Sequence, residues 1–103
     1  MKMPEKAERA FRKAISLAPN NPAGYRELAR FYLASKTNVA QAYGLAKKAI
    51  TLGRNAEAYY LLGWAADLNG DRTGALRAME QAIELQPKNP KYRQVYETIK
   101  KRR

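Results

Sequence analysis

Apolar residues recur at offsets of three and four along residues 56–89, and this spacing predicts two amphipathic helices. Gly70 and Asp71 mark the break between the two helices. The two apolar stripes consist of Tyr59, Leu62, Gly63 and Ala66, and then of Ala75, Met79, Ala82 and Ile83. Glycine inside a helix costs about 1 kcal/mol relative to alanine. Gly63 therefore predicts a place where a second helix comes very close.

The same periodicity extends on both sides of this segment. An Asn-Pro pair, which suits the start of a helix, occurs at residues 21–22 and again at residues 89–90. The further stripes are Ala7, Ala10, Phe11, Ala14 and Ile15; Tyr25, Leu28, Ala29 and Tyr32; Ala42, Ala46, Ala49 and Ile50; and Tyr92, Val95, Tyr96 and Ile99. We therefore expect an all-α protein of six helices.

Residues 56–89 resemble the tetratricopeptide repeat (TPR), a 34-residue helix–turn–helix with the pattern W-x2-L-G-x2-Y, then A-x3-F, then P. This sequence has Tyr59-x2-Leu62-Gly63-x2-Ala66, then Ala75-x3-Met79, then Pro87. The resemblance implies a single solenoid domain of about two and a half repeats with a capping helix. Its parts would be the second helix of a partial repeat at 1–21, full repeats at 22–55 and 56–89, and a cap at 90–103.

The amino-acid composition excludes several kinds of catalytic and metal-binding site. The 103 residues contain no cysteine and no histidine, which excludes disulfides and thiolate catalysis and removes the commonest general base and metal ligand. Ser16 and Ser35 thus have no histidine partner, and Asp67 and Asp71 have no third metal ligand near them. We expect no enzymatic activity, no bound metal and no cofactor.

The sequence predicts neither a membrane-spanning helix nor an export signal. No apolar run approaches the ~20 residues of a membrane-spanning helix. The start, MKMPEKAERA, lacks the apolar stretch of a signal peptide, and this favours a cytoplasmic location. Two alternatives stay open: a signal that has been removed, or a longer parent protein.

The net charge of +11 is unevenly spread. Residues 56–87 carry two Lys or Arg and five Asp or Glu, whereas residues 88–103 carry seven and one. Such a field can steer an acidic partner. The basic end Lys100–Arg103, with Lys91 and Arg93, could also contact nucleic acid or an anionic membrane, but no glycine-rich phosphate loop or RNA-binding motif accompanies it. We interpret it as a solubilising helix end and expect only non-specific binding to nucleic acid.

In TPR proteins the first helices of successive repeats line a concave groove that binds peptides or helices. The resemblance therefore implies an adaptor or scaffold for a protein or peptide partner. The alternatives are a basic nucleic-acid-binding protein, a module that self-assembles by end-to-end stacking, and helix faces that bind no ligand. Carried over to this sequence, the groove residues are Arg26, Arg30, Leu33, Glu57, Tyr60, Trp64, Asp67, Lys91 and Gln94.

Trp64 is the most distinctive of these residues. It follows Gly63 and lies off the apolar stripe of its helix. A large aromatic side chain in such a position suits a contact anchor, because aromatic residues dominate the energetics of interfaces. The alternative is that Trp64 packs over Arg30 or the cap and completes the core.

Arg26 and Arg30 are one helical turn apart, a spacing that suits a carboxylate or a phosphate. Some TPR domains clamp a peptide's terminal carboxylate with a Lys and an Asn one turn apart, an Asn of the second repeat and a later Lys–Arg pair. This sequence offers Arg26, Arg30, Leu61, Lys91 and Val95 there. The resemblance does not extend to that clamp, while a looser preference for acidic peptides remains open.

The first helix lacks the helix that precedes it in a complete repeat. One side of Ala7, Ala10, Phe11 and Ala14 would then face water, which the ends of solenoids avoid. We expect weak self-association at high concentration through Phe11, across a two-fold axis. One alternative is a stable monomer, because three of these four residues are alanine and the exposed area is small. Another is that upstream chain outside this sequence covers the face.

Overall fold

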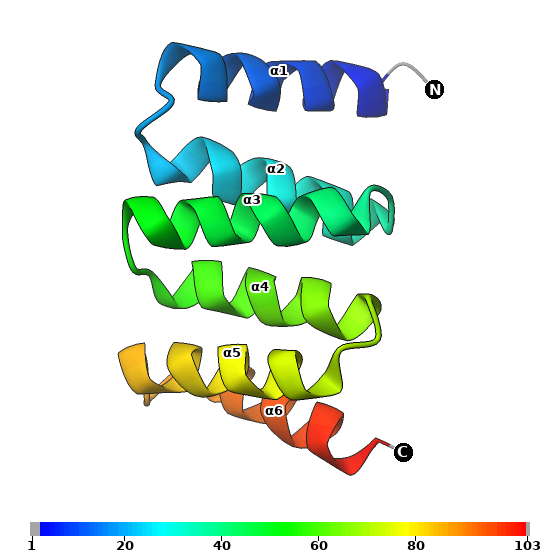
Figure 1. Cartoon of the computed structure of the whole chain (residues 1–103), viewed down its shortest axis with the longest axis vertical. Coiled ribbons are helices and arrows are strands. Elements are labelled where there is room, and N and C mark those ends of the chain that lie inside the picture. Colours follow the sequence, from blue (N-terminus) through cyan, green and yellow to red (C-terminus); the bar gives the residue numbers. More distant parts are fainter. Residues whose placement is uncertain (1–2, 103) are drawn as a thin grey trace.

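Six α-helices make up the computed structural model, which describes residues 3–102, and that range contains no strand. Short turns join the helices, which stack along the longest axis of the molecule with the first and the last at its two ends (Figure 1). The helices are α1 Met3–Leu17, α2 Pro22–Ser35, α3 Val39–Leu52, α4 Ala56–Leu68, α5 Arg72–Leu85 and α6 Pro90–Lys101. The predicted all-α solenoid of six helices is confirmed.

The starts of four helices are fixed by side chains that accept a hydrogen bond from the first turn. These caps are Asn21 of α2, Asn55 of α4, Asp71 of α5 and Asn89 of α6, with N···O distances of 2.9 to 3.1 Å. Pro22 and Pro90 follow two of the caps, at a position where a missing N–H costs nothing. Local sequence therefore sets where each of these helices begins.

Helices α4 and α5 approach closely at Gly63. A methyl group added there would lie 3.2 Å from the carbonyl oxygen of Ala75 and 3.3 Å from the methyl group of Ala78. These distances are shorter than ordinary van der Waals contact, so only glycine fits without movement of a neighbour. The close approach expected from the sequence at this position is confirmed.

The core is built on alanine stripes. Ala42, Ala46 and Ala49 of α3, and Ala75, Met79 and Ala82 of α5, have no exposed surface. The largest fully buried side chains, Tyr32, Leu28 and Leu33, belong to α2. This helix packs against both α3 and α4, so a wide face of it is covered.

Helix α6 closes one end of the stack. Tyr92 and Ile99 are buried against the preceding helices, as the sequence predicts. The opposite side of α6 is polar and exposed, and it consists of Lys91, Arg93, Gln94, Glu97, Lys100 and Lys101. The Arg72 guanidinium at the start of α5 donates to the carbonyl oxygen of Lys100 and so ties down the end of α6.

Helix α1 is held to α2 by a polar cluster at the edge of the core. The Tyr32 hydroxyl donates to the Glu8 carboxylate at 2.7 Å and accepts from the Arg12 guanidinium at 2.6 Å. Arg12 also donates to Glu8 at 3.1 Å. The hydrogen bond from Tyr32, with a smaller contribution from Arg12, lowers the pKa of the Glu8 carboxyl. Each group of the cluster thus has a partner across the α1–α2 contact.

The turn between α2 and α3 contains two residues in the left-handed conformation, Lys36 with φ 57° and Asn38 with φ 47°. In the turn between α4 and α5 the left-handed residue is Gly70, with φ 83°. The left-handed region is strained for residues with a side chain and free for glycine. Lys36 therefore carries strain that Gly70 does not.

Replacing Lys36 with glycine should raise the free energy of unfolding by about 0.5–1 kcal/mol, because the left-handed strain is relieved. The matched control is Lys47→Gly, which places glycine in the interior of α3 and should lower that free energy by about 1 kcal/mol. Urea denaturation followed by circular dichroism measures both. Loss of stability in both variants would contradict the assignment of strain to Lys36.

Glu8→Gln should lower stability near neutral pH but not in acid. The folded-state pKa of Glu8 lies below the unfolded value of about 4.3, so its stabilising effect is present above that pH and is lost as pH falls through the folded pKa. Thermal unfolding between pH 2 and pH 7 should show the two proteins converging at the acid end. Glu97→Gln, an exposed carboxylate on α6, is the control. A deficit of Glu8→Gln that is constant over the whole range would refute this coupling.

Candidate functional site

The predicted groove residues lie on three helices, α2, α4 and α6, and direct contacts join these helices. An ion-pair cluster connects α2 with α4, and an aromatic cluster connects α4 with α6. We call this surface the groove surface and define it by Arg26, Arg30, Glu57, Tyr60, Trp64, Asp67, Lys91 and Gln94. The structure therefore brings together residues of α2 and α4, and of α4 and α6, although the helices of each pair are not consecutive in the chain.

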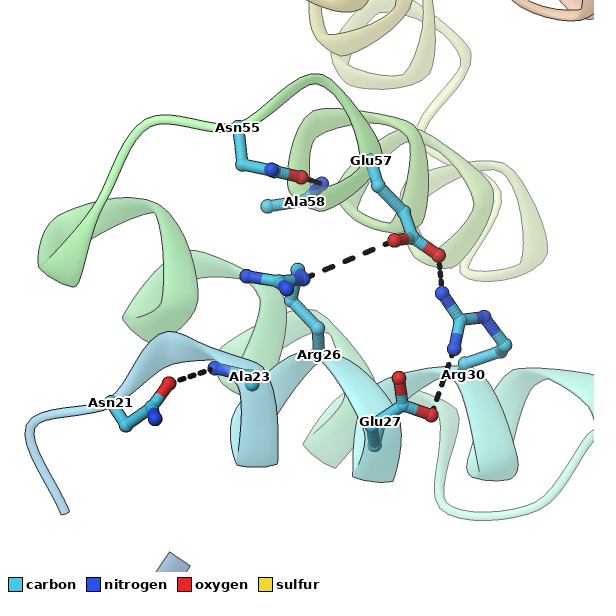
Figure 2. Close-up of polar contacts among 8 residues, drawn as sticks. All are labelled: Asn21, Ala23, Arg26, Glu27, Arg30, Asn55, Glu57 and Ala58. Atoms are coloured by element: carbon cyan, nitrogen blue, oxygen red, sulfur yellow. Dashed lines mark hydrogen bonds and ion pairs between the residues drawn. The ribbon is translucent and has the colours of Figure 1, made fainter. Parts of the chain in front are cut away.

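Arg26 and Arg30 converge on one carboxylate, that of Glu57 at the start of α4 (Figure 2). The Arg26 Nε atom lies 3.9 Å from a Glu57 oxygen, and the Arg30 guanidinium forms an ion pair with the other oxygen. Arg30 also binds Glu27, one turn back on α2, at 2.8 Å. The one-turn spacing does produce a carboxylate-binding pair of arginines, but the chain's own Glu57 occupies it.

Aromatic rings form the middle of the groove surface. The Tyr60 ring lies 5.8 Å from that of Trp64 and 5.6 Å from that of Tyr92, between ring centroids. The Lys91 ammonium lies over the face of Tyr60, 4.4 Å from its centroid. Burial raises the pKa of the Tyr60 hydroxyl.

A pocket of about 370 Å³ opens between α4 and α6. Tyr60, Trp64, Asp67, Gln94, Val95, Thr98, Ile99 and Arg102 line it. Arg102, the residue after the end of α6, binds both carboxylate oxygens of Asp67, at 2.7 and 2.8 Å. This ion pair raises the pKa of the Arg102 guanidinium. Four of the predicted groove residues thus share one pocket.

Trp64 is half-buried, so it can both complete the core and serve as a contact anchor, the two roles that the sequence suggests. Part of its side chain packs against the core cluster that contains Leu28 and Leu61, and part lines the pocket. Its ring lies beside Tyr60 on the same helix face. A partner entering the pocket would meet this indole directly.

The expectation that Leu33 lines the groove is wrong. Leu33 has no exposed surface and belongs to the core cluster with Leu61 and Ala65 of α4. Because α4 covers α2 in addition to α3, the buried face of α2 is wider than its apolar stripe alone indicates. Leu33 therefore supports the groove surface from beneath.

Sequence reasoning missed Arg102, which it assigned to a solubilising basic end. Its partner Asp67 lies on another helix, and no pattern along the chain links the two residues. Arg103, the last residue of that basic end, lies outside the described residues. Spacing within one helix could reveal Tyr60, Trp64 and Asp67 as neighbours, but not the arginine that meets them.

Phe11 lies on α1, away from the groove surface. Its ring is half-buried against that of Phe31 on α2, with 5.8 Å between the centroids. Ala10 and Ala14 on the same helix are exposed, and 76% of the Leu17 side chain is exposed. The contacts of Phe11 are thus made with α2, while the far side of α1 faces solvent.

The described residues offer neither a metal-binding cluster nor a membrane-spanning helix. No group of three or more Asp, Glu, His or Cys side chains in residues 3–102 could hold a metal ion. None of the six helices in that range has both the length and the apolar character needed to cross a membrane.

Comparison with known proteins identifies the fold family. Models described as tetratricopeptide repeat match residues 56–89 and residues 1–21, which together make up more than half of the chain. No curated protein matches the chain.

Two solved structures are similar throughout. An Arabidopsis OM64 TPR domain has a TM-score of 0.89 and 24% identity, over 99% of this chain and 84% of that one. The first TPR of Spaghetti (RPAP3), bound to the HSP90 peptide SRMEEVD, has a TM-score of 0.88 and 24% identity, over 94% and 79%. The repeat spacing, the stack of six helices and these matches show that the chain belongs to the tetratricopeptide repeat family.

Proposed function

We propose that this protein is a non-catalytic adaptor that binds a peptide or protein partner on the groove surface. The observation that carries the proposal is the pocket between α4 and α6, where the half-buried Tyr60 and Trp64 meet charged residues at the rim. Partly exposed aromatic side chains surrounded by polar groups are typical of the central contacts of protein interfaces. A flat, fully polar helix face would offer no such anchor.

The comparisons support a peptide as the partner. The RPAP3 structure of the same fold holds a peptide of HSP90, and its similarity extends over 94% of this chain. At 24% identity the likeness shows the fold alone, so the peptide itself is not carried over. A rigid stack of helices with one recessed, aromatic surface suits the docking of an extended segment.

A non-catalytic role agrees with the side chains available. The sequence has no histidine and no cysteine, the residues that most often act as general base and nucleophile. The carboxylates of the groove surface are paired with arginines, Glu57 with Arg26 and Arg30 and Asp67 with Arg102. The surface therefore offers recognition and no activated group.

The test is to select peptides from a random library against the whole chain and to measure the binding of a selected peptide to variants. Trp64→Ala should weaken binding at least about fivefold, which is ~1 kcal/mol, with helicity unchanged. Leu85→Ala is the matched control, since Leu85 is a large apolar residue, 39% exposed, that lies outside the pocket. Equal effects of the two substitutions would refute the groove assignment.

We also propose weak self-association through α1. Its residues Ala7, Phe11 and Ala14 have the spacing of Ala42, Ala46 and Ala49 on α3, which are fully buried because the first helix of their repeat covers them. On α1 the corresponding positions are half-buried or exposed. A second copy of the chain could cover this side of α1, at concentrations high enough to overcome like-charge repulsion.

Sedimentation velocity at increasing protein concentration should show association of the wild type, and more of it at high salt, where charge repulsion is screened. Phe11→Glu should remain monomeric. Since Phe11 also packs on Phe31, the exposed Ala14→Glu is a second variant that leaves that contact intact. A monomeric wild type at all concentrations and salts would rule the association out.

A further inference from the structure

We propose that the pocket between α4 and α6 binds a basic side chain of the bound peptide, an arginine or a lysine. In the free protein the chain's own Arg102 occupies the position of that side chain. This inference rests on the proposed function, because it names the ligand group that the same groove surface selects. It reverses the acidic preference that the net charge of +11 suggests.

Asp67 is the fixed half of the site. It lies within α4, and only 20% of its side chain is exposed. Arg102 supplies a positive charge beside this carboxylate and binds both of its oxygens through one Nη atom, at 2.7 and 2.8 Å. A ligand that displaces Arg102 can replace this pairing only if it brings a positive charge of its own.

Arg102 is the replaceable half of the site. It lies beyond the end of α6, its backbone is extended with φ −69° and ψ 143°, and 51% of its side chain is exposed. An ion pair with so exposed a partner contributes little to stability. The Arg102 side chain can therefore leave the pocket while α6 stays packed through Tyr92 and Ile99.

The neighbouring rings suit a cation. Tyr60 and Trp64 line the same pocket as Asp67, and cations within about 6 Å of an aromatic centroid are attracted to its face. Tyr60 already accepts one, since the Lys91 ammonium lies 4.4 Å from its centroid. A guanidinium can stack on a ring and bind a carboxylate through two N–H groups, so arginine fits better than lysine.

The second charged cluster of the groove surface consists of Arg26, Arg30 and Glu57. All three lie within helices that pack against each other, whereas Arg102 lies beyond the end of α6. The arginines there are already neutralised by a carboxylate (Figure 2). Selection by charge is therefore concentrated at Asp67.

The experiment uses three short peptides and the single tryptophan as reporter. Acetyl-Gly-Arg-Gly-amide is titrated into the full chain at 0.15 M salt, and the indole N–H signal of Trp64 is followed by NMR. The citrulline peptide keeps the shape of arginine without its charge, and the glutamate peptide reverses the charge. We expect the arginine peptide to bind at least about fivefold more tightly than either of the others.

Two variants test the roles of the pair. Arg102→Ala should tighten binding of the arginine peptide about two- to fivefold, because the internal competitor is gone. Asp67→Asn should remove the preference for arginine over citrulline. Lys101→Ala is the matched control, since it removes one positive charge beside Arg102, and it should change nothing beyond a small electrostatic shift. Circular dichroism verifies that each variant stays helical.

Equal binding of the arginine and citrulline peptides would overturn the inference, and so would preference for the glutamate peptide. The third contrary result is that no peptide shifts the Trp64 signal, either in the wild type or in Arg102→Ala. None of these affects the proposed adaptor function, which depends on the loss of library-selected binding in Trp64→Ala. The opposite combination is also informative. If the arginine peptide shifts the Trp64 signal preferentially but Trp64→Ala does not weaken binding of the library peptides, the cation-binding pocket is supported and the proposed adaptor function is refuted.

Discussion

Helices α4 and α5 pack as closely as they do because residue 63 has no side chain. The Ala75 carbonyl and the Ala78 methyl group occupy the space that a larger residue would need. Interhelical distance depends on side-chain size at the contact, so this glycine and the alanines of α3 and α5 set the spacing of the whole stack. The separation of α4 from α6, and with it the width of the pocket, follows from that spacing.

Local signals explain why the fold was predictable. The stripes of small and large residues, the Asn-Pro starts and Gly63 each act within a few residues of the chain. The conformation of Lys36 was not predictable, because nothing in its neighbourhood requires a left-handed residue. It accompanies the hydrogen bonds that end α2, from the Lys36 N–H to the Leu33 carbonyl and from the Thr37 N–H to the Tyr32 carbonyl.

The groove surface was predictable only where one helix supplies it. Tyr60, Trp64 and Asp67 share a face of α4 by spacing alone, and Arg26 and Arg30 share a face of α2. The partners of these residues depend on tertiary packing. Glu57 meets the arginines because α4 lies on α2, Leu33 is buried for the same reason, and Arg102 reaches Asp67 because α6 ends beside α4.

Every strongly packed pair of helices is adjacent in the chain, apart from α2 with α4, which are separated by one helix. No segment has to cross over or thread past another, and each turn is only a few residues long. Such a topology has low contact order, so little loop entropy is lost before contacts form. It is also modular: a copy of residues 56–89 placed after itself would present the same capping asparagine, the same glycine and the same alanine stripe to its neighbours. The chain could thus lengthen by whole repeats without the redesign of any interface.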